Sequence, residues 1–326
     1  MATDQAFCHL KATIFSRRSC ISPQSQFDHF PSSMFGVLER PPQVLALPLL
    51  PPKMQPVDLL ILGAGWTSTF LIPLLERRNI TYAATSTTGR DGTIKFTYDP
   101  SSPPSSFSVL PTAKHILITF PLTGPDQSGQ VISNYKSTHP RTGDVGFIQL
   151  GSTGIFQIEG QDTWVTRSSR YNESNARAVA EDELLGRGGC VLNLSGLWGG
   201  PRQPKNWVSR VAKTKDDVRA KKSLHMIHGE DVARGVVAVC AQWEQAKGQR
   251  WMLTDGFVYD WWALFAGWAD VDDEEGMPSE QARWVWECMR EDEVRALPRP
   301  VEALGRCYDG REFWETFGLV PLKARI

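Results

Sequence analysis

The sequence has no long hydrophobic run and no concentration of basic charge. Its most apolar stretch, VLALPLLPP at 44–52, is short and broken by prolines, whereas a membrane-spanning helix needs about 20 apolar residues. Its 35 Lys and Arg are balanced by 36 Asp and Glu, and the basic residues are spread along the chain. That pattern lacks the basic surface that binds nucleic acid. We therefore expect a small-molecule partner, with no membrane and no nucleic acid.

The chain also lacks a CxxC pair and a secretory apolar segment at its start. Its cysteines are far apart: Cys8, Cys20, Cys190, Cys240, Cys288 and Cys307. This spacing favours reduced thiols in an intracellular protein over a disulfide framework. We expect a cytoplasmic protein, with a mitochondrial location as the alternative.

That alternative comes from residues 1–53, where Ser and Pro are frequent and no helical or strand period persists. We predict a disordered leader here. The sequence SRRS at 16–19, in a stretch poor in acidic residues, also fits a mitochondrial presequence. An unstructured extension without an address remains the other interpretation.

From Val57 onwards, short apolar runs alternate with helical or polar stretches. The predicted strands are 57–62, 81–86, 93–98, 115–120, 145–150 and 189–199. Such near-continuous apolar strands indicate an α/β fold with a parallel sheet covered on both faces. We expect a cofactor domain at 54–195 and a C-terminal part at 196–326, with helices starting near Asp231 and spanning about 311–317.

The first predicted strand is followed at once by a glycine turn, LILGAGWTSTF. Gly63 allows a tight turn, and Gly65 lets the backbone approach a pyrophosphate at the start of the next helix, at Trp66 and Thr67. Ser68 replaces the third glycine of the dinucleotide fingerprint with another small residue. Because this turn lies between a predicted strand and a predicted helix, we expect it to bind a dinucleotide.

The end of the second predicted strand bears on which dinucleotide is bound. An acidic residue there would bind the ribose 2′-hydroxyl of NAD, but this chain has Ser86 to Arg90 with no carboxylate before Asp91. Arg90 is suited to a 2′-phosphate, because its guanidinium forms bidentate hydrogen bonds. Ser86 and Arg90 therefore favour NADP, with NAD as the alternative and a solvated loop charge as the other interpretation of Arg90.

Four segments in this order resemble the extended short-chain dehydrogenase/reductase superfamily, the NAD(P)-dependent epimerase/dehydratase group. They are GAGWTSTF, STGIF, LSGLWGGPR and HMIHGEDVARGVVA, and the similarity covers residues 57–265. The resemblance implies a Rossmann-type doubly wound sheet of seven strands and a smaller, intertwined C-terminal substrate domain. It also implies cofactor contacts at Pro121, Ser152, Thr153, Gly196 and Leu197. A homodimer is expected by analogy alone.

The resemblance also implies a catalytic arrangement that this chain alters. In the superfamily a Ser or Thr after the fifth strand works with a YxxxK helix, in which lysine lowers the pKa of the tyrosine. Ser152 takes the hydroxyl position, but Phe156 replaces a nearby tyrosine, and Arg177 and Glu181 stand where Tyr and Lys would be. Arginine cannot act as a base near neutral pH. An atypical branch of the superfamily has a similar R…E arrangement.

Two interpretations of Arg177 and Glu181 stay open. They form either an exposed i,i+4 ion pair or a site in which Arg177 anchors an anion or carbonyl and Glu181 orients it. Tyr171 is a candidate substitute acid. The function is accordingly an NADP-preferring oxidoreductase or epimerase-like enzyme for a small carbonyl or alcohol, or else a non-catalytic dinucleotide sensor.

Two further patterns are weighed against structural roles. His225 and His228 lie in a stretch with strand-like alternation, where residues three apart face opposite sides, so we expect no metal site. The part after Gly196 holds ten of the twelve tryptophans, which either line an aromatic substrate pocket or fill a core. We expect at least one of Trp261 and Trp262 to be core.

Overall fold

The structure, a computed structural model, describes residues 55–140, 143–161, 164–269 and 277–326. They belong to one compact unit, Pro51–Ile326. The leader predicted for residues 1–53, with its mitochondrial alternative, lies outside the described residues. Within the described ranges, no helix combines the length and apolar character needed to cross a bilayer.

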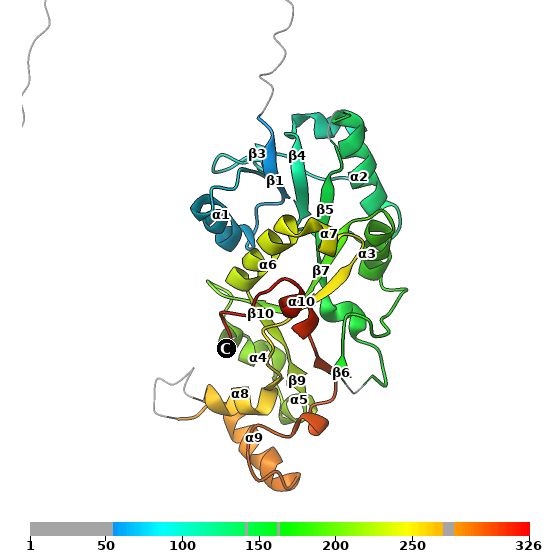
Figure 1. Cartoon of the computed structure of the whole chain (residues 1–326). Helices are drawn as coiled ribbons and strands as arrows, with labels where there is room; N and C mark the ends of the chain where they lie inside the picture. Colours follow the sequence, from blue (N-terminus) through cyan, green and yellow to red (C-terminus); the bar gives the residue numbers. More distant parts are fainter. Residues whose placement is uncertain (1–54, 141–142, 162–163, 270–276) are drawn as a thin grey trace, which may run out of the picture. The chain divides into compact units, whose positions relative to one another are not determined.

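A seven-stranded sheet forms the centre of the unit (Figure 1). In spatial order its strands are β11 (Arg250–Leu253), β7 (Cys190–Leu194), β5 (Gly146–Ser152), β4 (Ala113–Ile118), β1 (Val57–Leu62), β2 (Tyr82–Ser86) and β3 (Ile94–Lys95). Every neighbouring pair is parallel. The predicted Rossmann-type doubly wound fold is therefore confirmed. In such sheets ligands bind beyond the carboxyl ends of the strands, where the order reverses, here between β1 and β4.

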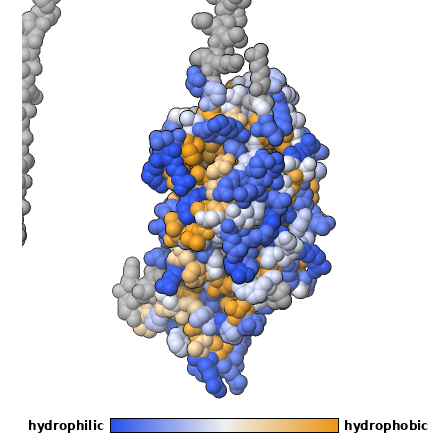
Figure 2. Space-filling model, viewed as in Figure 1, coloured by the Kyte–Doolittle hydropathy of each residue, from blue (hydrophilic) through white to orange (hydrophobic). Residues whose placement is uncertain are grey.

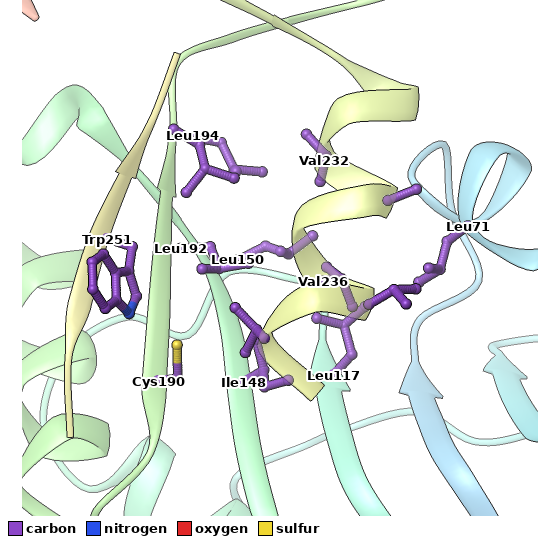
Figure 3. Close-up of a cluster of buried hydrophobic side chains, with 14 of the residues drawn as sticks. Leu71, Leu117, Ile148, Leu150, Cys190, Leu192, Leu194, Val232, Val236 and Trp251 are labelled. Carbon is purple, nitrogen blue, oxygen red and sulfur yellow. The ribbon is translucent and has the colours of Figure 1, made fainter. Parts of the chain in front are cut away.

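Side chains of each strand alternate between two cores. On one face, Ile148, Leu192 and their neighbours pack against α1 (Ser68–Arg77), α6 (Gly229–Ala241) and α10 (Arg311–Thr316). Figure 3 shows Val232 and Val236 of α6 facing these strand residues. On the other face, Ile116 and Phe147 pack against η1 (Pro104–Val109), α2 (Gln127–Thr138) and α3 (Ala176–Gly186). Burial on both faces explains why the strand sequences are almost continuously apolar.

A third core lies in the C-terminal part. It joins α4 (Val208–Val211), α5 (Lys215–Ala220), α8 (Trp261–Gly267) and α9 (Glu280–Glu291). Trp261 and Trp262 are both buried in it, so these two tryptophans are core residues. The helix α7 (Trp243–Ala246) follows α6, and short 3-10 helices occur at Thr153–Phe156, Pro204–Trp207 and Val301–Ala303.

Three small two-stranded sheets lie outside the central one, and the last of them joins the C-terminal part to the segment after β5. They pair β8 (Gly196–Trp198) with β10 (Met226–His228), β9 (Ser223–Leu224) with β12 (Tyr259–Asp260), and β6 (Trp164–Val165) with β13 (Cys307–Tyr308). The edge strand β11 also comes from this part, so the two parts of the chain are interleaved in the central sheet.

Two predicted strands had the wrong bounds. The segment 189–199 is two strands, because the chain leaves the central sheet at Ser195 and β8 pairs with β10 instead. The segment 93–98 forms a strand only at Ile94–Lys95. The helix α6 begins at Gly229, close to the predicted start near Asp231, and Nδ1 of His228 caps it by accepting from the backbone N–H of Glu230.

Hydrophobic residues on the face in Figure 2 form patches within a largely hydrophilic surface. The most exposed large hydrophobic side chains in the described ranges are those of Val320, Trp286 and Met277. They belong to different segments, and isolated exposed apolar residues are ordinary in folded proteins.

Candidate functional site

The glycine turn between β1 and α1 is fixed by both neighbouring strands. Gly63 has φ +97°, and a side chain on it would collide with Oγ1 of Thr119, which donates 2.6 Å to the carbonyl of Gly63. From the other side, Oγ1 of Thr85 accepts from the N–H of Gly63 at 3.0 Å. Only glycine suits such a backbone. Sequence reasoning missed both threonines, which immobilise the turn.

Beyond the turn, the chain presents unpaired backbone donors at the start of α1. The N–H groups of Trp66 and Thr67 have no acceptor within the described part of the chain, whereas those of Ala64, Gly65 and Ser68 are bonded. A Cβ on Gly65 would meet no atom within 4 Å, so open space lies in front of it. Ser68 is buried where the third glycine was expected. Free N–H groups at a helix N-terminus, beside an uncrowded glycine, fit a pyrophosphate.

The loop after β2 brings Arg90 to this turn. Oγ of Ser86 accepts from the N–H groups of Gly89 and Arg90 and shares a hydrogen bond with Thr93, so it is engaged in shaping the loop. Nη2 of Arg90 donates to the carbonyl of Ala64 at 3.0 Å, while 62% of the side chain is exposed. The arginine therefore lies at the edge of the glycine turn, and its guanidinium has further N–H groups available to a ligand.

Trp66 links the turn to the C-terminal part. Its Nε1 donates to the carbonyl of Gly199 at 3.1 Å, and the guanidinium of Arg202 lies 4.6 Å from the centre of its ring. The ring also packs edge-on against Phe70. The segment after β8 is thus held against the start of α1.

A cavity of about 430 Å³ lies beyond the carboxyl ends of β5 and β7. Ser152, Thr153 and Gly196, all predicted from the sequence, line it. The residues that line the remainder come from the C-terminal part or the segments beside the strands, and they include Ser195, Lys222, His225, Arg306 and Tyr308. None of the lining residues is a tryptophan, so a tryptophan-lined pocket is not found here.

Ser152 ends β5 with a hydroxyl that can still donate. Its Oγ accepts from the N–H of Gly154 at 3.1 Å and is bonded to no acceptor within the described residues. Thr153 is different, because its Oγ1 donates to the carbonyl of Leu194 at 3.3 Å. Ser152 therefore has its proton available to a molecule in the cavity, while Thr153 supports the wall.

Tyr308, His225 and Arg306 form one side of the cavity and were missed by sequence reasoning. The hydroxyl of Tyr308 donates to the carbonyl of Thr153 at 3.1 Å, and burial raises its pKa, an effect that Arg306 opposes. Nε2 of His225 accepts from the N–H of Tyr308 at 3.0 Å. Burial, assisted by the positive charge of Arg306, lowers the pKa of His225 to about 4, so this imidazole is neutral near pH 7.

Comparisons with known proteins gave structural matches only. No protein-family model matches the sequence, and no curated protein matches it. A functionally unknown conserved protein from Silicibacter pomeroyi is 17% identical, with a TM-score of 0.53 over 83% of this chain and 93% of that one. A short-chain dehydrogenase/reductase superfamily protein from Agrobacterium tumefaciens, with bound NAD, is 12% identical, with a TM-score of 0.53 over 82% and 93%. A human epimerase family protein, solved with NADPH, is 11% identical, with a TM-score of 0.52 over 81% and 95%.

The chain shares the fold of this short-chain dehydrogenase/reductase superfamily protein. Of the structures named above, the one from Agrobacterium tumefaciens contains NAD and the human one contains NADPH. In this chain the glycine turn and the cavity occupy the carboxyl edge of the sheet, the ligand-binding edge of such a fold.

The exposed ion pair predicted for Arg177 and Glu181 on α3 is not formed. Glu181 is fully buried, where Oε2 accepts from Nδ2 of Asn193 at 2.8 Å and pairs with Arg250 at 3.3 Å. Burial raises its pKa, which these contacts and the charge of Arg177 oppose. Arg177 is partly buried, and its guanidinium forms no hydrogen bond or ion pair with a described residue. Its role as an anchor for an anion or carbonyl stays a prediction.

Tyr171 packs against a small core that includes Phe156 and Tyr308, and it does not itself line the cavity. Its hydroxyl donates to Oδ1 of Asp182 at 2.9 Å, and Arg250 lies 4.4 Å from its ring centre. Phe156, in the place of the superfamily tyrosine, is buried against it. Both rings therefore have packing contacts. The role of Tyr171 as a substitute acid stays a prediction.

The remaining predicted positions have ordinary surroundings. Pro121 is exposed after β4, and Leu197 lies on β8 opposite Ile227. Their cofactor contacts stay predictions. His225 faces the cavity, whereas His228 packs against Phe70 and Trp198. Within the described ranges, no three His, Cys, Asp or Glu side chains are grouped as a metal site requires.

Proposed function

We propose that the chain binds NADP(H) at the glycine turn and acts as an oxidoreductase on a small carbonyl or alcohol compound in the adjacent cavity. The observation that carries the proposal is the pair of unbonded N–H groups, of Trp66 and Thr67, in front of the open face of Gly65. A pyrophosphate would satisfy both donors and complement the positive end of the α1 dipole.

The preference for NADP rests on Arg90. Its guanidinium donates to the carbonyl of Ala64 and lies 3.8 Å from the exposed carboxylate of Asp91, while 62% of the arginine side chain remains open to solvent beyond the end of β2. A 2′-phosphate there would gain charge-assisted hydrogen bonds that a 2′-hydroxyl does not.

When bound, NADP supplies or accepts a hydride. The chain itself contributes hydroxyl groups at the cavity wall. The free proton of Ser152 would donate to a carbonyl oxygen and so favour hydride arrival at the carbon. Tyr308, which keeps its proton near pH 7, or water would supply the proton that the reduced oxygen takes up.

A second function, cofactor sensing without turnover, is favoured by Glu181. Where the superfamily has a lysine that holds the ribose and lowers a tyrosine pKa, this chain has a buried carboxylate bound by Asn193 and Arg250. No cation is presented from that position. This arrangement leaves cofactor binding intact and removes the usual acid/base pair.

Thermal shift with NADPH and NADH tests the binding that both functions share. We expect NADPH to raise the melting temperature, and failure of both nucleotides to do so would contradict both functions. Oxidation of NADPH in the presence of a broad carbonyl panel then separates them. For the enzyme we expect Ser152→Ala to lose about 100-fold or more in turnover while binding NADPH as the unmodified chain does. NADPH binding without turnover of any compound in the panel would support the cofactor-sensing function.

A further inference from the structure

The cavity contains positive charge that no carboxylate of the described chain neutralises. Arg306 and Lys222 both line it, and neither forms an ion pair with any described residue. The lining includes no Asp and no Glu. His225, the other basic side chain, is neutral. Arg306 is partly buried, and its side chain interacts with Tyr308 but with no carboxylate of a described residue, so an anion bound in the cavity would serve as its counter-ion.

Two buried polar atoms of this cavity lining also lack partners. Nε of Arg306 and Oγ of Ser195 are inaccessible to solvent, and neither has a hydrogen-bond partner. Buried polar atoms are nearly always bonded in folded proteins, so two orphans on one cavity need an explanation. A ligand with oxygen acceptors would satisfy a guanidinium and a hydroxyl together.

We propose that the cavity binds the carboxylate of a small oxo or hydroxy acid, with Arg306 as its counter-ion and Ser195 as a neutral donor. A carboxylate can accept two hydrogen bonds from the planar guanidinium of Arg306. Its single negative charge also balances the single positive charge of that arginine. Lys222 is exposed at the cavity, where it attracts the anion from solvent. The cavity size of about 430 Å³ suits a small molecule.

The assignment of an oxo or hydroxy group rests on the proposed function, because Ser152 lines the same cavity and offers its proton to a carbonyl oxygen. The carboxylate site itself rests only on Arg306, Ser195 and the absence of acidic groups in the lining. The two inferences are therefore separable by experiment.

The test is binding of 2-oxo acids with three to six carbons to the full chain, with and without saturating NADPH. The methyl esters of the same acids and inorganic phosphate serve as comparison ligands. We expect at least one acid to bind at least 10-fold more tightly than its ester and than phosphate. Equal binding of acid and ester, tighter binding of phosphate, or no binding of any acid would overturn the proposal.

Variants locate the site. Arg306→Gln should weaken acid binding at least 10-fold, and Arg306→Lys, which keeps the charge, should weaken it less. Arg283→Gln removes an exposed arginine of α9 that does not line the cavity, and this variant should bind like the unmodified chain. Should Arg306→Gln fail to fold, Ser195→Ala is expected to weaken binding several-fold. Unchanged binding in both Arg306→Lys and Ser195→Ala would overturn the site.

The same titrations distinguish the two inferences. NADPH binding without acid binding removes the carboxylate site and leaves the proposed function. Acid binding that depends on Arg306, without any NADPH binding, removes the proposed function and leaves the site.

Discussion

Glu181 on α3 and Asn193 on β7 are joined by a 2.8 Å hydrogen bond beneath the end of β5. Both side chains are fully buried, and Oε1 of the same glutamate accepts from the N–H of Ser152 at 3.3 Å. A side chain on Gly151 would collide with this carboxylate. The glutamate therefore positions the segment that carries Ser152. It does so from α3, and it does not line the cavity.

Replacing Glu181 should destabilise the fold. Glu181→Ala leaves Asn193 with only the carbonyl of Ser152 as acceptor, removes the acceptor of the Ser152 N–H and leaves Arg250 with Asp182 as its remaining ion-pair partner, so we expect a loss of about 3 kcal/mol. Glu181→Gln keeps the shape and one acceptor, and we expect a loss nearer 1 kcal/mol. Urea unfolding measures both. Equal, small effects would show that the network contributes little.

The two glycines of the turn should respond oppositely to alanine. Gly63→Ala places a Cβ at φ +97° against Thr119, so we expect a loss of at least about 1–2 kcal/mol in stability. Gly65→Ala meets no atom of the chain and should leave the melting temperature unchanged, yet weaken NADPH binding about 10-fold by crowding the pyrophosphate. Unfolding curves and NADPH titrations distinguish the two. Unaltered NADPH affinity in Gly65→Ala would argue against a pyrophosphate site at the glycine turn.

Arg90 should set the choice of cofactor. Arg90→Gln removes the charge beside the turn, and we expect NADPH binding to weaken about 10-fold while NADH binding stays the same. Arg78→Gln, at the other end of α1, is the matched control and should change neither affinity. A fall in both affinities would mean that Arg90 shapes the loop and does not select the phosphate.

His225 should make stability depend on pH. Its pKa in the folded chain, about 4, lies below the value of about 6.5 expected when unfolded. The unfolded state therefore binds more protons between these values. The contribution of neutral His225 is complete above about pH 6.5 and is lost as pH falls towards 4, at a cost of up to about 3 kcal/mol.

Comparison with His225→Gln isolates that effect, since glutamine can accept the same bond from Tyr308 without titrating. We expect the stability of the unmodified chain relative to this variant to decline from pH 7 to pH 4.5. A constant difference across that range would show that the imidazole titrates normally.

The sequence predicts the central sheet well, because strands buried on both faces must be apolar almost throughout. Leu59, Ile61 and Leu117 belong to one core while Leu60 and Ile116 belong to the other, so both faces of these strand segments are apolar. The glycine turn was also predictable from the sequence. Gly63 has a positive φ, a conformation that glycine adopts and most other residues do not.

The site depended on contacts that local patterns do not encode. Glu181 sits four residues after Arg177, a spacing that suggests an ion pair, but Arg250 and Asn193 approach it from distant segments. Tyr308 reaches the cavity because β13 pairs with β6, a connection spanning more than a hundred residues. A short strand such as Cys307–Tyr308 carries no periodicity from which that placement could be predicted.

The edge strand β11 has a consequence for how the protein is produced and dissected. Arg250–Leu253 pairs with β7 along its length, and Trp251 and Leu253 belong to the same core as Leu192. A fragment ending at residue 195 would therefore expose an apolar strand with unpaired backbone groups, a surface that promotes aggregation. The central sheet is incomplete without the C-terminal part, so the growing chain completes it only after residues 250–253 have been synthesised.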